Sequence, residues 1–235
     1  MSAAAPLRVA ELHAYYGESH VLHGVNCHVE QGEVVTLLGR NGAGRTTTLR
    51  ALLGLVGNRS GSVVINGEET IALPPHRIAH LGVGYCPEER GIYASLSAEE
   101  NLLLPPPLAE GGLSVEEIYE MFPNLRELRL RQGTHLSGGE QQMLALARIL
   151  RTGARLLLLD EISEGLAPVI VQALSRTIHK LRSQGYTIVM VEQNFGFAAP
   201  LADRFYIMDR GRIVDGFAAS ELQGKMTMLH EFLGV

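Results

Sequence analysis

The sequence predicts an α/β fold built on a mostly parallel sheet. Three short apolar runs carry this prediction: Glu33 to Leu38, Leu156 to Leu159, and Thr187 to Val191. A segment with helical spacing follows each run, which is the alternation typical of a parallel sheet. Because most successive positions within each run are apolar, we expect these strands to be covered on both faces.

The composition excludes two classes of protein. The chain of 235 residues has a formal net charge of -5, which argues against a dedicated nucleic-acid binder. Its longest apolar runs are far shorter than the roughly 18 to 20 residues that cross a bilayer, so any membrane role depends on a partner. The first residues, MSAAAPLRVAEL, lack the basic and apolar regions of a secretory signal, which predicts a cytoplasmic location.

Cysteine and histidine spacing predicts no structural metal. Cys27 and Cys86 belong to no CxxC pair, so we expect free thiols. His20, His23 and His28 follow one another at steps of three and five residues. In a strand these steps place the side chains on both faces, so we expect them to be scattered.

The flanking segments predict further strands and helices. Alternation from Val21 to Val29 predicts a strand with one buried face, followed by a turn at Gln31-Gly32; the expected buried side chains are Val21, Val25, Cys27 and Val29. Arg204 to Gly216 predicts a hairpin around Asp209-Arg210-Gly211, and Ser220 to Leu233 predicts a closing helix.

The middle of the chain has a different character. After Pro87 the pattern changes to helices joined by polar and proline-rich links, such as Pro105-Pro106-Pro107. We therefore expect a helical lobe at 88–152, inserted into a single domain that spans 1–235.

A glycine-rich segment follows the first apolar run: Gly39-Arg40-Asn41-Gly42-Ala43-Gly44-Arg45-Thr46, then Thr47, with a helix expected from Thr46 to about Leu53. Its spacing is that of the P-loop, G-x-x-x-x-G-K-[ST], except that arginine replaces lysine. Its glycines let backbone N–H groups point at phosphate oxygens, and the Thr46 hydroxyl suits Mg²⁺. Taken alone, the segment could also be an ordinary strand-to-helix turn.

Two carboxylates follow the second apolar run. Asp160 is placed to bind Mg²⁺, directly or through water, and Glu161 to activate an attacking water. Alone, this pattern is more typical of a core strand that meets a solvated loop. Together with a P-loop, it predicts a nucleotide hydrolysis site.

A second candidate anion site precedes the amphipathic helix expected from Gln142 to Arg151. Ser137 offers a hydroxyl, and Gly138 and Gly139 offer N–H groups at a helix N-terminus. One chain does not need two such sites for one γ-phosphate, so we expect this one to serve a partner. Ser137 and Glu140 also form a capping-box pattern, and both interpretations can hold at once.

LSGGEQ, between the P-loop and LLLLDE, resembles the signature of the ATP-binding cassette (ABC) ATPases, and the resemblance covers essentially the whole chain. MFPNLRELR, LSGGEQQMLALAR, LLLLDEISEGLAP and VEQN most resemble the branched-chain amino acid transport ATP-binding proteins. The resemblance implies a P-loop NTPase of the ABC ATPase fold, with an N-terminal antiparallel β subdomain. It also implies that ATP is held between one subunit's P-loop and the signature of another.

The same resemblance assigns roles to single residues. Tyr16 matches the aromatic that stacks on adenine, Glu88 the glutamine that senses Mg²⁺, and Gln193 the switch histidine. The cofactors implied are ATP and Mg²⁺. Thr46, Glu88 and Asp160 are the residues expected to bind the metal. Glu88, Gln193 and Ala167 depart from the general family toward the branched-chain subfamily. Arg45 and Ile162 are less expected, since lysine and proline are usual there.

The implied partners are integral membrane permease subunits, a second ABC ATPase subunit, identical or related, and, indirectly, a periplasmic solute-binding protein. The implied location is the cytoplasmic face of the inner membrane. Two alternatives stay open: a non-transport ABC ATPase acting on ribosomes or chromosomes, and a degenerate subunit that binds ATP but hydrolyses little. The first usually needs two cassettes or a long coiled coil. Arg45 keeps the degenerate-subunit alternative open. The sequence does not indicate which solute is transported.

Overall fold

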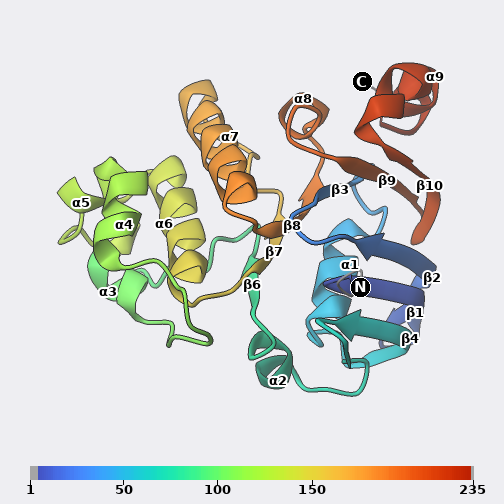
Figure 1. Ribbon diagram of the computed structural model, residues 1–235, viewed down its shortest axis with the longest axis horizontal. Helices are drawn as coiled ribbons and strands as arrows, with labels where there is room; N and C mark the ends of the chain where they lie inside the picture. The colour runs from blue at the N-terminus through green and yellow to red at the C-terminus, as the bar shows by residue number, and fades with distance from the viewer. Residues whose placement is uncertain (1–4, 234–235) are drawn as a thin grey trace.

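The computed structural model describes residues 5–233 (Figure 1). Its strands form two β-sheets. The larger sheet has the order β10-β9-β3-β8-β7-β6, with all neighbours parallel except β10 against β9. Its strands are β3 (Val34–Leu38), β6 (Val83–Cys86), β7 (Leu156–Asp160), β8 (Thr187–Glu192), β9 (Arg204–Asp209) and β10 (Arg212–Ala218). The mostly parallel core sheet predicted from the sequence is confirmed.

The smaller sheet is antiparallel and has the order β2-β1-β4-β5. Its strands are β1 (Leu7–Tyr16), β2 (Ser19–Val29), β4 (Asn58–Ile65) and β5 (Glu68–Glu69). Helix α1 (Arg45–Leu52) packs between the two sheets, where Leu49 and Leu52 join one apolar cluster with side chains of β1, β2, β3 and β7. This packing fixes the start of α1 against both sheets.

The remaining helices surround the larger sheet: α2 (Pro75–Ala79), α3 (Ala98–Leu103), α4 (Val115–Met121), α5 (Pro123–Glu127), α6 (Gly138–Arg151), α7 (Pro168–Ser183), α8 (Phe195–Ala198) and α9 (Leu222–Leu233). Helices α3 to α6 gather on one side of α7 in Figure 1. Within residues 5–233, no helix has both the length and the apolarity that crossing a membrane requires.

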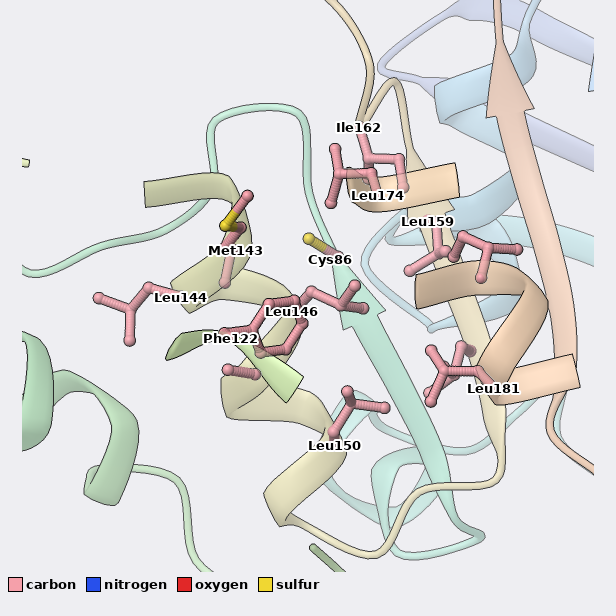
Figure 2. Packing of buried hydrophobic residues seen from close by; sticks show 14 of the residues in the cluster. Cys86, Phe122, Met143, Leu144, Leu146, Leu150, Leu159, Ile162, Leu174 and Leu181 are labelled. Atoms are coloured by element: carbon pink, nitrogen blue, oxygen red, sulfur yellow. The ribbon is translucent and has the colours of Figure 1, made fainter. Parts of the chain in front are cut away.

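A continuous apolar core joins α3 to α6 with α7 and the sheet. In Figure 2, Met143 and Leu146 of α6 lie near Cys86 of β6, and Leu150 of the same helix belongs to the same cluster. Leu181 of α7 belongs to the same cluster and is fully buried. Since burying one leucine side chain contributes about 1.5–3 kcal/mol, this shared core holds the helices of the segment 88–152 firmly against the sheet.

The main strands agree with the sequence analysis because every residue of β3, β7 and β8 is buried. The carboxyl ends of these three parallel strands meet at one edge of the sheet. That edge receives the glycine-rich loop after β3, Glu161 after β7, and Gln193 after β8.

The expected burial pattern of β2 is partly wrong. Leu22, Val25 and Val29 are buried, whereas Val21 and Cys27 are only half-buried. The register against β1 passes from Leu12–Val25 to His13–His23, so Gly24, with φ of 76°, is left unpaired as a bulge. One extra residue reverses the alternation of side chains between the two faces.

Several boundaries shift by a few residues. Helix α1 begins at Arg45 and ends at Leu52, one residue earlier than expected at each end. Helix α6 begins at Gly138, four residues earlier, because Ser137 and Glu140 form the predicted capping box. The hairpin of β9 and β10 is confirmed, and a short 3₁₀ turn over Ala219–Glu221 delays the last helix to Leu222. Residues 1–4, part of the segment interpreted as lacking a leader, lie outside the described residues.

The expectation that the histidines scatter is wrong for two of them. His20 lies with its Nε2 3.1 Å from Nδ1 of His13, and its ring centroid is 4.0 Å from that of His23. Tyr15 stacks on the same ring with centroids 4.2 Å apart. A second register shift, between Ala14 and Tyr15 of β1, skips Val21 and places His20 on the same face as His23, while His28 lies elsewhere beside Tyr206.

This histidine cluster predicts a loss of stability in acid. Partial burial lowers the pKa of His23, and positive charge on His20, Arg212 and His13 lowers it further. A histidine with a folded pKa below its unfolded value, about 6.5, costs stability as the pH falls through that value, because the unfolded chain binds the proton more readily. We expect the melting temperature to drop less between about pH 7.5 and 5.5 in His23→Gln than in the parent. Parallel melting curves for the two proteins would contradict this.

Candidate active site

The glycine-rich loop encloses a cavity of about 360 Å³ between β3 and α1. Gly42 and Gly44 have φ of 81° and 104°, in the left-handed region that favours glycine. A Cβ on Gly39 would lie 2.5 Å from the backbone oxygen of Met208, so that position has no room for a side chain. The cavity is lined by Val21, Asn41, Gly42, Ala43, Gly44, Arg45, Thr46, Thr47, Glu88, Glu161 and Glu164.

Thr46 lines this cavity and contacts Asp160, which is fully buried. The Thr46 hydroxyl donates to Oδ1 of Asp160 over 2.9 Å, and the Tyr85 hydroxyl donates to Oδ2 over 3.0 Å. Burial raises the pKa of Asp160, and these two hydrogen bonds oppose the rise. The oxygen donors of Thr46, Asp160 and Glu88 are of the hard type that Mg²⁺ prefers, so these residues fit the expected metal.

Arg45 lies inside the protein and not in solvent, with its side chain 4% exposed. Its Nη2 donates to Oε1 of Glu161 over 2.7 Å and to Oδ1 of Asn41 over 3.3 Å. Its Nη1 is buried and lacks a hydrogen-bond partner among residues 5–233. Because a buried unsatisfied donor costs about 1–3 kcal/mol, Nη1 suits an acceptor such as a phosphate oxygen.

Glu161 occupies a constrained position directly after β7. Its φ is 48°, an uncommon value for a residue with a side chain, and its N–H donates to the carbonyl of Val191 over 2.9 Å. Burial raises the pKa of Glu161 to about 8, with a further contribution from Glu164 and Glu88 and against the charge of Arg45. Carboxyl oxygens of these three glutamates lie within 4.8 Å of one another. A carboxylate with a pKa near neutrality suits a general base.

Gln193 lies outside the loop cavity but borders a second one beside it. This cavity, of about 620 Å³, is lined by Glu161, Ser163, Glu164, Gly165, Leu166, Pro168, Val171, Gln172, Glu192, Gln193 and Asn194. Glu161 and Glu164 line both cavities, so they lie at the boundary between the cavity of the phosphate loop and the cavity at the end of β8.

Other predicted residues are not brought into the loop cavity. Tyr16 ends β1 with 45% of its surface exposed, which leaves its ring free to stack on a ligand. Arg40 is also exposed. The second candidate anion site opens α6 and borders neither cavity: Ser137 accepts from the N–H of Glu140 over 3.3 Å, and Gly138 and Gly139 follow it. That these residues face a partner stays a prediction.

The sequence analysis missed two residues that line the loop cavity. Glu164 could have been suspected, because it lies three residues after Glu161 and its N–H closes a turn onto the Glu161 carbonyl over 3.2 Å. Val21 comes from β2, and no local pattern indicates that it reaches the phosphate loop.

Residues 22–164 match the family model described as ABC transporter. The chain belongs to the ABC transporter family. It is 43% identical to the high-affinity branched-chain amino acid transport ATP-binding protein BraG of Pseudomonas aeruginosa, over 85% of this chain and 87% of that protein. It is 36% identical to the probable branched-chain amino acid transport ATP-binding protein LivF of Archaeoglobus fulgidus, over 92% and 93%. It is also 32% identical to the lipopolysaccharide export system ATP-binding protein LptB of Escherichia coli K12, over 98% of each.

Solved structures agree on the fold. A nucleotide-free ATP-binding cassette from an ABC transporter superposes with a TM-score of 0.82 at 22% identity, over 95% of each chain. An ATP-binding subunit of an ABC transporter gives 0.79 at 28% identity, over 97% of this chain and 96% of that one. The protein is therefore an ATP-binding subunit of an ABC transporter and an ATPase.

Proposed function

We propose that this ABC ATPase powers the import of branched-chain or other amino acids. The observation that carries the proposal is its 43% identity to BraG over most of both chains. The similarity to LivF at 36% points to the same substrate class. The identity to LptB is lower, at 32%, but extends over 98% of both chains. Export of a lipid-linked glycan is therefore the second candidate.

In this proposal, one ATP binds in the loop cavity of each subunit with Mg²⁺. The backbone N–H groups from Gly39 to Thr47 bind the phosphates, and the Tyr16 ring stacks on adenine. Arg45 donates to phosphate oxygens through its unpartnered Nη1. Thr46, Asp160 and Glu88 would hold Mg²⁺, which neutralises charge on the phosphates.

Hydrolysis needs a base and a group that binds the γ-phosphate. Glu161 takes a proton from the attacking water, and the amide of Gln193 donates to the γ-phosphate. Ser137, Gly138 and Gly139 of a second subunit complete the site from the opposite side, with Glu140 capping their helix. The helical lobe at 88–152 presents these residues within a single domain over 1–235.

The proposed partners are two integral membrane permease subunits and a second ABC ATPase subunit, identical or related. A periplasmic solute-binding protein delivers the amino acid, and no nucleic acid takes part. The subunit lies on the cytoplasmic face of the inner membrane. The two alternatives from the sequence are less well supported: the intact Asp160–Glu161 pair argues against a degenerate subunit, and the relatives named above are transport proteins.

Purification of the complex from its native membrane tests this function. We expect amino-acid permease subunits to co-purify, and leucine-loaded receptor to raise the ATPase rate of the reconstituted complex. The same complex with Glu161→Gln is the control, because it assembles without turning over. Co-purification of lipopolysaccharide-export components, with no response to amino acids, would support the second candidate instead.

Mg-ATP should stabilise the isolated chain. A ligand present at 100 times its Kd adds about 2.7 kcal/mol, which raises the melting temperature of a domain of this size by roughly 5 to 10 °C. Differential scanning fluorimetry measures the shift, and Thr46→Ala should reduce it because the hydroxyl beside Asp160 is lost. An unmoved curve in both proteins would contradict the nucleotide site.

A further inference from the structure

A buried carboxylate lies next to the candidate active site, and the reaction described above does not use it. Glu192 is the last residue of β8 and is 1% exposed. Its Oε2 accepts from the hydroxyl of Ser163 over 2.8 Å, and its Oε1 accepts from the Ser163 N–H over 3.2 Å. Ser163 is itself 4% exposed, so both bonds lie out of water. A buried carboxylate costs free energy unless it is hydrogen-bonded, and these bonds offset that cost.

The two partners lie on the two loops that carry the proposed catalytic groups. Ser163 comes two residues after Glu161, and Glu192 directly precedes Gln193. Just after the paired part of β7 and β8, one more backbone hydrogen bond joins the two segments: the N–H of Glu161 donates to the carbonyl of Val191 over 2.9 Å. Beyond that point, the side chain of Glu192 holds the turn after β7 to the end of β8.

The turn needs such support because its backbone is strained. Glu161 has φ of 48°, a left-handed conformation that is unfavourable for a residue with a side chain. Such conformations persist where surrounding contacts hold them. The bidentate contact with Ser163 supplies a contact of this kind, and all three residues line the same cavity as Gln193.

We propose that Glu192 is a positioning residue whose two hydrogen bonds to Ser163 fix Glu161 relative to Gln193. The proposal rests on the base and γ-phosphate roles given above to those two residues. Misplacing a catalytic group by about 1 Å costs on the order of 100-fold in rate. The two hydrogen bonds of this contact involve no atom of the phosphate loop, so we expect a larger effect on turnover than on ATP binding.

Ser163→Ala and Glu192→Gln test the contact in the full chain assembled with its membrane partner. We expect each to lower kcat by about 10- to 100-fold, with the Kd for ATP changed by less than about threefold. The double variant should be no slower than the worse single one, because both changes remove one interaction. Thr177→Ala is the matched control. It removes another buried hydroxyl, bonded to the Ala173 carbonyl over 3.0 Å on α7, and should leave kcat unchanged.

Hydrogen exchange provides a readout that does not need ATP. Ser163→Ala should speed amide exchange at 192–195, and Glu192→Gln should speed it at 161–165, whereas Thr177→Ala should do neither. The proposal is overturned if kcat in both site variants stays within about twofold of the parent. Exchange confined to the substituted loop, or a parallel loss of kcat and ATP affinity, also overturns it. Full activity in Glu161→Gln would instead defeat the proposed catalytic roles, while the exchange measurement still tests the contact.

Discussion

Glu161→Gln is expected to slow ATP turnover by about 10²- to 10⁴-fold while ATP affinity stays nearly unchanged. Glutamine has the same shape and can still accept the hydrogen bond from Nη2 of Arg45, so the loop cavity keeps its structure. It cannot take a proton from water. Burial raises the pKa of the Glu161 carboxyl to about 8, and the substitution removes this titratable group.

Steady-state hydrolysis with contaminating ATPases excluded measures the change, and size-exclusion chromatography should show the ATP-bound dimer accumulating. Glu116→Gln is a matched control, because this exposed glutamate lies on α4, away from both cavities. The control should hydrolyse ATP at the parent rate. Normal turnover by Glu161→Gln would remove this residue from the mechanism.

Arg45→Ala is expected to abolish tight ATP binding. Arg45 places positive charge in a cavity that Glu88, Glu161 and Glu164 also line, and its removal leaves those carboxylates without that charge. Each hydrogen bond to a charged group contributes about 1.5–3 kcal/mol, so losing two bonds to phosphate raises the Kd by at least about 100-fold. Isothermal titration with Mg-ATP measures this directly, and an unchanged Kd would contradict it.

Arg45→Lys decides whether the site has adapted to arginine. The guanidinium divides its donors, with Nη2 on Glu161 and Asn41 and Nη1 free for a phosphate. An ammonium is a single point of charge and cannot reproduce that fork. We expect Arg45→Lys to gain little in the ATPase rate of the complex assembled with its membrane partner. A gain of several-fold would show a site still shaped for lysine, in a subunit that favours binding over turnover.

The sequence alone predicted the features that depend on neighbouring residues. Mainly apolar runs indicated β3, β7 and β8, because a strand covered on both faces has no polar side to alternate with. Since parallel strands end at one edge, the same runs also indicated that the glycine-rich loop, Asp160 and Glu161 meet there. Ser137 and Glu140 indicated a capping box closed within four residues, which the structure confirms, although the helix was expected to begin only at Gln142.

The tertiary structure alone decided what depends on register and on distant side chains. Register shifts of β2 against β1 left Gly24 and Val21 unpaired, reversed the faces of the strand, and gathered His13, His20 and His23. Val21 lines the cavity of the phosphate loop. No local pattern encodes a one-residue slip, because its cost and benefit are set by the partner strand.

Arg45 shows the same division most clearly. The sequence determined that a cation follows the glycines of the phosphate loop, and it left open whether that cation points into solvent. The structure places Arg45 against Glu161, 116 positions later in the chain, with 4% of the Arg45 side chain and 9% of the Glu161 side chain exposed. Their pairing depends on β3 and β7 lying in one sheet, separated by β8, so that both loops open at the same edge. The low dielectric at that edge makes the pairing strong, and burial is a property of the folded chain.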